Sequence, residues 1–135
     1  MRLALAQLDQ TAGDVKGNVD RAATAVADAA ARGADMVVLP ELFTVGYFAF
    51  DTYTRAAEGL GGPTFSRLSA LAADHGVALL AGSHVEDLAA SAAAGADVPA
   101  AEGLANTCVF YDRDGTRRAV YRKHHLFGSE SAETR

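Results

Sequence analysis

The chain has 135 residues, which is enough for one domain with its own hydrophobic core. Hydrophobic residues make up 50% of it and charged residues 21%, as in ordinary globular proteins. Its formal net charge of -5 argues against a general binder of nucleic acid or of anionic membranes.

The first part of the chain predicts a strand, a helix and a second strand. Residues 3–8 are mostly apolar, and polar residues interrupt the stretch too early for a signal peptide, so we predict a buried strand. Asn18 is a candidate N-cap for a helix whose apolar residues recur at helical spacing up to Gly33. Gly33 would end that helix in a left-handed conformation. Residues 36–39 form a short apolar strand of the kind that is covered on both faces.

The middle of the chain predicts a long loop, a helix and a strand. Residues 43–60 form an aromatic-bearing connection. Pro63 suits the first turn of a second helix, which Gly76 would end. Residues 77–81 predict another apolar strand, and the Ala- and Gly-rich residues 88–103 are predicted to be a mobile surface insertion.

The last part predicts a hairpin, with strands over residues 107–111 and 116–122 and a turn over 112–115. The complete order predicts an α/β layered fold in which helices cover one face of a mixed sheet. Residues 129–135 are polar and contain no closing element, so we expect residues 1–135 to be the first part of a longer domain.

Glu41 is the first candidate for chemistry, because it directly follows the strand-like run and Pro40. Carboxylates favour such positions for structural reasons, since they meet backbone N–H groups there, and spacing alone favours that interpretation. The functional alternative is a general base held by partial burial at the end of a strand. Open α/β sheets collect their reactive groups in the loops beyond strand ends.

Lys123 is the second candidate and lies in the basic cluster of residues 117–125. Considered alone, it is more simply explained as a solvated strand end. A phosphate or RNA site is a weaker alternative, because no RNP-like aromatic motif accompanies the cluster. The catalytic alternative is a lysine that stabilises negative charge on a tetrahedral intermediate.

Other reactive residue types give weaker signals. His84, His124 and His125 do not predict a metal site, because adjacent histidines on an extended chain point to opposite faces and no chelating motif is present. Residues 59–62 lack the spacing of a nucleotide-binding loop.

Cys108 lies inside a predicted strand, where cysteine usually packs as a small hydrophobe. The alternative is a nucleophilic Cys108, which would need exposure and an activating group.

Several motifs occur together in a fixed order: Leu39-Pro40-Glu41-Leu42-Phe43, Gly46-Tyr47, Ala81-Gly82-Ser83, Asn106-Thr107 and Tyr121-Arg122-Lys123-His124-His125-Leu126-Phe127-Gly128. In this order they resemble the N-terminal half of the carbon–nitrogen hydrolase (nitrilase) superfamily. The resemblance implies an α-β-β-α sandwich, truncated in this chain, whose members form dimers or larger assemblies. It implies no metal and no organic cofactor.

The same resemblance assigns roles to particular residues. Glu41 would be the general base, and Lys123 would stabilise the tetrahedral intermediate. Tyr47 matches a pocket-lining position, and either Glu130 or Glu133 would be a second glutamate that positions the substrate. The nucleophilic cysteine of the family lies downstream of the lysine, beyond the last residue of this chain.

The resulting expectation is a hydrolase of non-peptide carbon–nitrogen bonds that converts a small aliphatic amide, rather than a nitrile, to an acid and ammonia through a cysteine acyl-enzyme. Without that cysteine the chain alone is expected to be inactive. The alternative is an inactive remnant that serves as a binding or assembly partner, since half of a layered domain leaves apolar surface uncovered.

We expect a homo-oligomer with a small-molecule substrate and no nucleic-acid or membrane partner. A single cysteine agrees with a cytoplasmic location.

Overall fold

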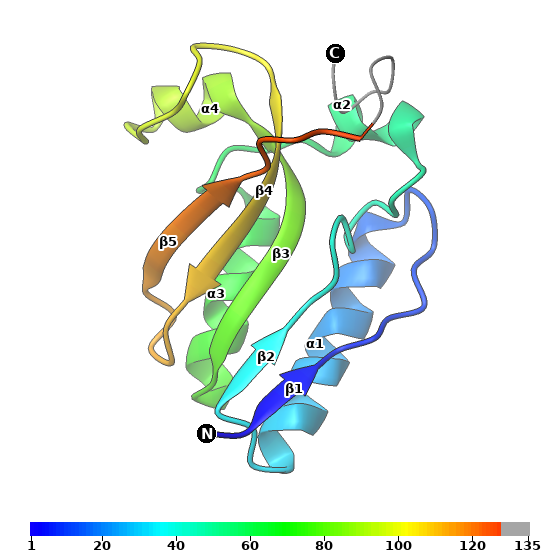
Figure 1. Ribbon diagram of the computed structural model, residues 1–135, viewed down its shortest axis with the longest axis vertical. Helices are drawn as coiled ribbons and strands as arrows, with labels where there is room; N and C mark the ends of the chain where they lie inside the picture. The colour runs from blue at the N-terminus through cyan, green and yellow to red at the C-terminus, as the bar shows by residue number, and fades with distance from the viewer. Residues whose placement is uncertain (128–135) are drawn as a thin grey trace.

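The computed structural model describes residues 1–127, which form a five-stranded mixed sheet with helices on one face (Figure 1). In spatial order the strands are β1 (Leu3–Leu5), β2 (Met36–Val38), β3 (Ala78–Asp87), β4 (Leu104–Tyr111) and β5 (Arg117–Arg122). β1, β2 and β3 are parallel, whereas β4 is antiparallel to both of its neighbours. The predicted mixed sheet with helices on one face is therefore confirmed.

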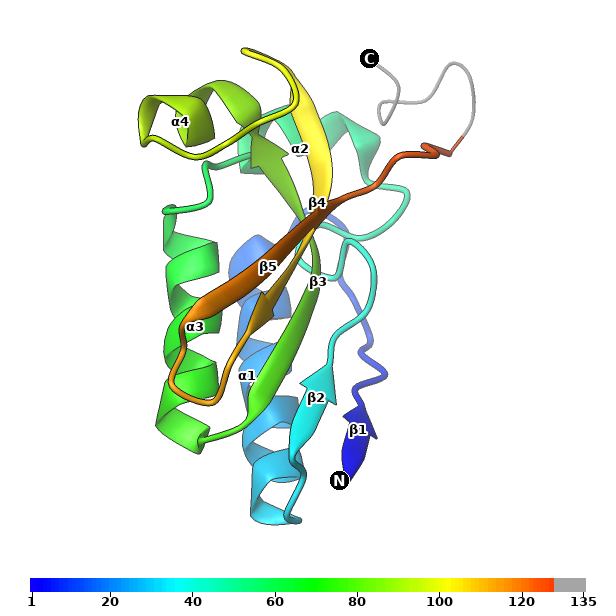
Figure 2. The same ribbon diagram turned by 60° about the vertical axis from the view of Figure 1, so that its left-hand side comes forward.

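Two helices, α1 (Val15–Ala31) and α3 (Pro63–His75), lie side by side against the same face of the sheet (Figure 2). Their apolar sides meet the apolar side chains of β2, β3 and β4. The buried residues of this core include Val19, Ala22, Val26, Val37, Phe65, Leu68, Leu79 and Val109. Within residues 1–127, none of the helices is both long enough and apolar enough to span a bilayer.

The N-terminus of α1 differs from the prediction. Its N-cap is Asp14, whose Oδ1 accepts a hydrogen bond of 3.0 Å from the backbone N–H of Gly17. Asn18 is instead a buried residue of the helix, and its amide donates to the carbonyls of Thr11 and Thr44 at 2.8 Å each. Both residue types cap helices well, so the pattern alone did not separate them. The predictions of a left-handed Gly33 after α1 and of an end of α3 at Gly76 are confirmed, with φ of 79° and 62°.

The prediction of a mobile insertion over residues 88–103 is wrong for its first part. Residues Leu88–Ala93 form α4, which Asp87 caps by accepting a hydrogen bond of 3.1 Å from the N–H of Ala90. Alanine is the best helix former, and the glycine and proline that suggested a loop lie after the helix. The connection over residues 43–60 also contains a 3₁₀ turn, η1 (Phe50–Thr52), and a short helix, α2 (Tyr53–Ala56).

The face of the sheet opposite α1 and α3 carries no helix in the described part of the chain (Figure 2). One apolar row crosses this face with one residue from each strand: Leu5, Val38, Leu80, Phe110 and Ala119. None of the five is buried, and Leu5 is 74% exposed. We call these five residues the open-face row.

Candidate active site

Glu41 and Lys123 meet at one edge of the sheet although 82 residues separate them in the chain. Glu41 follows β2 and Lys123 follows β5, and both strands run parallel to β3. The carboxyl ends of parallel strands lie at the same edge, which is where such sheets place their reactive groups. Lys123 Nζ donates to Glu41 Oε1 over 2.9 Å. The structure thus brings together the two residues that the sequence selected.

Asn106 of β4 contacts both members of this pair. Its side-chain Nδ2 donates to Glu41 Oε1 over 2.9 Å, and its carbonyl accepts a hydrogen bond of 2.9 Å from the backbone N–H of Lys123. Asn106 is only 8% exposed. The sequence analysis quoted this asparagine only within a motif and gave it no role. A polar residue in the buried middle of a strand was the available signal, because buried polar groups need partners.

The surroundings of Glu41 differ from the prediction of partial burial. The Glu41 side chain is 45% exposed, whereas that of Lys123 is 23% exposed. Glu41 faces the side of the sheet that no helix of residues 1–127 covers. In this chain its carboxylate is therefore positioned by two hydrogen bonds, from Lys123 and Asn106, and is not set apart from solvent by burial.

The loop that carries Glu41 is held by β3. Leu42 has a φ of 48°, in the left-handed region that non-glycine residues rarely adopt, and its N–H donates to Ser83 Oγ over 3.0 Å. Two residues later, Thr44 Oγ1 lies 2.6 Å from His84 Nδ1. Ser83 and His84 lie where the β3–β4 register shifts, so an irregularity of the strand turns both toward the loop.

His84 belongs to the core. It is 1% exposed, and its Nε2 lies 3.3 Å from Glu58 Oε1. Burial raises the pKa of Glu58, but hydrogen bonds from His84 and Thr64 outweigh it and hold that pKa below its usual value. His124 stacks on Tyr121 with a centroid distance of 5.9 Å. Among residues 1–127, no three His, Cys, Asp or Glu side chains are grouped so that they could share a metal ion.

Tyr47 lies beside the pair, with Lys123 Nζ 5.7 Å from the centroid of its ring. The ring also makes an edge contact with Phe127 at 5.9 Å. The lining role that the resemblance gave to Tyr47 stays a prediction. The other two substrate-binding candidates, Glu130 and Glu133, lie outside the described residues.

A cavity of about 220 Å³ opens next to the pair. It is lined by Glu41, Gly82, Ser83, Asn106, Cys108 and Tyr121. Cys108 is half-buried in β4, as expected for a residue inside a strand, and burial raises the pKa of its thiol above the ordinary 9.0. Because only the thiolate is a good nucleophile, this environment disfavours attack by Cys108 at neutral pH.

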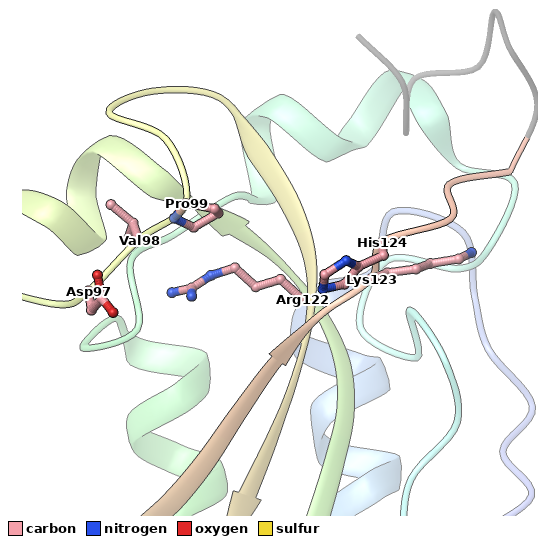
Figure 3. A pocket seen from close by; sticks show the side chains of 6 residues that line it. All are labelled: Asp97, Val98, Pro99, Arg122, Lys123 and His124. Atoms are coloured by element: carbon pink, nitrogen blue, oxygen red, sulfur yellow. The ribbon is translucent and has the colours of Figure 1, made fainter.

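A second, larger cavity of about 400 Å³ lies on the other side of the end of β5 (Figure 3). It is lined by Asp97, Val98, Pro99, Arg122, Lys123 and His124. Figure 3 shows Arg122 extending toward the loop of Asp97 and Pro99, while the Lys123 side chain extends in the opposite direction. The ammonium that meets Glu41 therefore does not point into this cavity.

Comparison with known proteins assigns the family. The family model for carbon-nitrogen hydrolases matches residues 2–135, nearly the whole chain. The chain belongs to the carbon–nitrogen hydrolase family. The expectation drawn from the ordered motifs is confirmed.

Individual members of this family resemble the chain in sequence and in structure. The human omega-amidase NIT2 is 37% identical over 126 residues, which are 93% of this chain and 41% of the human protein. Nit3 of Saccharomyces cerevisiae, a solved member of the nitrilase superfamily, gives a TM-score of 0.74 at 29% identity and covers 93% of this chain and 44% of its own. The fold is thus that of nitrilase-superfamily proteins, and the chain spans less than half the length of these relatives.

A third relative was solved with an amide bound. It is the amidase of Nesterenkonia sp. AN1, with one glutamate replaced by glutamine and one cysteine replaced by alanine, in complex with acrylamide. Its TM-score to this chain is 0.72 at 29% identity, over 95% of this chain and 44% of that one.

Proposed function

We propose that residues 1–135 are the N-terminal part of a single hydrolase domain that converts a small aliphatic amide to the corresponding acid and ammonia. In this proposal Glu41 is the general base and Lys123 stabilises the oxyanion. The nucleophilic thiol comes from sequence downstream of this chain. The observation that carries the proposal is the 2.9 Å contact between Lys123 Nζ and Glu41 Oε1 at the carboxyl edge of the sheet.

The chemistry follows from these groups. Glu41 takes the proton of the thiol, and the sulfur attacks the amide carbon to give a tetrahedral intermediate. The ammonium of Lys123 stabilises the negative charge that develops on the amide oxygen. The C–N bond then breaks as Glu41 returns the proton to the leaving nitrogen. Glu41 next deprotonates a water, which attacks the thioester and releases the acid and the thiol.

Two further observations support a small amide as the substrate. The cavity beside Glu41 measures about 220 Å³, below the roughly 300–1,000 Å³ of pockets for drug-sized ligands. Human NIT2 is named an omega-amidase, and the Nesterenkonia amidase was solved with acrylamide, a small amide, whereas one relative, from Schizosaccharomyces pombe, is named a probable nitrilase. A small aliphatic amide is therefore favoured over a nitrile.

The experiment measures ammonia release from simple aliphatic amides by the gene product extended with its natural downstream sequence. Removing a general base typically lowers turnover about 10²–10⁴-fold, so we expect losses of this order for Glu41→Gln and a comparable loss for Lys123→Ala. Lys16→Ala is the matched control, because Lys16 is 87% exposed on α1 and should leave turnover unchanged. Wild-type turnover in Glu41→Gln or Lys123→Ala would contradict the assigned roles.

The open-face row favours a second candidate, a non-catalytic assembly partner. Monomeric proteins rarely expose contiguous apolar surface of this kind, and large exposed patches mark sites of association. A second copy of this chain carries the same apolar row, so two copies could cover each other face to face around a two-fold axis. This candidate predicts a homodimer without amide turnover.

A further inference from the structure

Glu86 of β3 is a charged side chain in the interior of the fold, with a relative exposure of 0%. Its carboxylate accepts bonds of 2.8 and 2.9 Å from Nε and Nη2 of Arg122. β4 lies between β3 and β5, and the hydroxyl of its Thr107 donates a third hydrogen bond of 2.7 Å to the Glu86 carboxylate. This network spans β3, β4 and β5 on the helix-covered side of the sheet. Its donors are the kind that make a buried carboxylate tolerable, because a buried charge needs a partner.

Arg122 is the last residue of β5, and Lys123 is the next residue. Side chains that are neighbours along a strand point to opposite faces of the sheet. Because Glu86 holds the Arg122 side chain on the helix-covered face of the sheet, the Lys123 side chain lies on the opposite face, where Glu41 also lies. Figure 3 shows these two side chains extending in opposite directions from the end of the strand.

The backbone pairing of β4 with β5 also fixes the register at Arg122 and Lys123. Thr107 is paired with Arg122 in the β4–β5 register, and the next residue toward the strand end, Lys123, still donates its N–H to the carbonyl of Asn106. A slip of one residue would reverse every side chain and turn Lys123 into the core. Strand ends fray most readily, so a fixed contact at the final residue has the largest effect on the residue after it.

From this we infer that Glu86 and Arg122 are positioning residues, whose buried two-bond ion pair sets the side of the sheet on which Lys123 emerges and thereby its contact with Glu41. The importance of that contact for turnover rests on the proposed function. The geometric claim itself does not, and it can be tested without any reaction.

The chain contains two lysines, Lys16 and Lys123, so one can serve as the internal reference for the other. Both are ion-paired, but the Lys16 side chain is 87% exposed and that of Lys123 is 23% exposed. Limited acetylation followed by mass spectrometry of the peptides gives the ratio of modification at Lys123 to that at Lys16. We expect a low ratio in the wild-type chain, because the Lys123 side chain that Glu41 holds is much less exposed than that of Lys16.

The decisive variant replaces both partners, Glu86→Leu with Arg122→Met. Exchanging a buried ion pair for apolar residues is often neutral or stabilising, so the double variant should remain folded, which a cooperative unfolding transition verifies. We expect the acetylation ratio to rise roughly tenfold, the factor that corresponds to loss of one charge-assisted hydrogen bond. A folded double variant with the wild-type ratio would overturn the inference.

Two single variants complete the test. Arg118→Met is the matched control, because Arg118 lies on the same strand and pairs with Asp112 at 3.2 Å on the surface; its ratio should equal that of the wild type. Glu86→Gln keeps the length of the side chain, removes the charge that holds Arg122 and adds no lysine, so it should raise the ratio partially. If the double variant does not fold, an unchanged ratio in Glu86→Gln rejects the inference in its place.

Failure of this test and failure of the proposed function give different results. A rise of the acetylation ratio together with no amide turnover in the longer gene product would leave the positioning role intact and remove the enzymatic one. Turnover with an unchanged ratio would do the opposite.

Discussion

At the scale of single residues, the buried Glu86 links the stability of the fold to pH. Burial raises the pKa of this carboxyl, but the hydrogen bonds from Arg122 and Thr107 outweigh burial and hold the pKa below its ordinary 4.5. The unfolded chain therefore binds a proton at higher pH than the folded chain does. Stability contributed by Glu86 is fully present above 4.5 and is lost as the pH falls through the lower, folded-state pKa.

Glu86→Gln tests this linkage. At neutral pH the variant should lose about 3–5 kcal/mol of unfolding free energy, because the Arg122 charge is left without its partner. As the pH falls below 4.5, the difference from the wild type should shrink, since the wild-type carboxyl then becomes neutral as well. Urea unfolding at a series of pH values measures both quantities. A difference that is independent of pH would show that Glu86 is not ionised in the fold.

Cys108 gives a second prediction at this scale. Because burial raises the pKa of its thiol above 9.0, we expect slow reaction of the native chain with a thiol reagent at neutral pH and fast reaction after denaturation. The ratio of the two rates, followed by absorbance, is the measurement. Rapid labelling of the native chain would revive the alternative in which Cys108 is a nucleophile.

At the scale of secondary-structure elements, helix ends depend on backbone conformation more than on the space around them. Gly76 ends α3 with a φ of 62°, and a methyl group added to it would meet nothing within 4 Å. Gly61, just before α3, is equally open but has no left-handed φ. The two positions therefore separate conformational strain from crowding.

Gly76→Ala should lower the unfolding free energy by about 1–2 kcal/mol, the cost of a left-handed conformation for a residue with a Cβ. Gly61→Ala, the matched control, should be neutral or stabilise by up to about 1 kcal/mol, because alanine reduces the entropy of the unfolded chain. Thermal or urea unfolding compares them. Equal effects of the two substitutions would contradict the assignment of Gly76 as a conformational helix stop.

At the scale of the whole molecule, residues 1–127 form one sheet with helices on a single side, and the other side presents an apolar row. The assembly candidate depends on this arrangement. A chain that pairs through this face should associate as its concentration rises, and interruption of the row should prevent association.

Leu5→Glu places a charge in the open-face row, and Phe48→Glu places one at an equally exposed residue outside the sheet; both wild-type side chains are 74% exposed. We expect sedimentation velocity to show dimers for the wild type and for Phe48→Glu, and monomers for Leu5→Glu. A wild-type chain that stays monomeric at every concentration would rule out the assembly candidate.

The sequence by itself determined the order of the elements, because strand and helix periodicities and left-handed glycines such as Gly33 are local properties. Its ordered motifs also named Glu41 and Lys123 as candidates, whereas their positions near strand ends alone favoured a structural role. The sequence did not identify Asp14 as the N-cap of α1, because both aspartate and asparagine cap helices. It also did not predict the helix over residues 88–93, because the nearby glycine and proline suggested a loop.

Only the tertiary structure decided which polar groups meet. The contacts of Asn106 with Glu41, and of Glu86 with Arg122, join residues 65 and 36 positions apart. Such pairs depend on strand order and register, including the irregularity of β3 near Ser83, and a shift of one residue would exchange their faces. Register is fixed by packing of the whole sheet, so residues far apart in the chain become neighbours only once the fold exists.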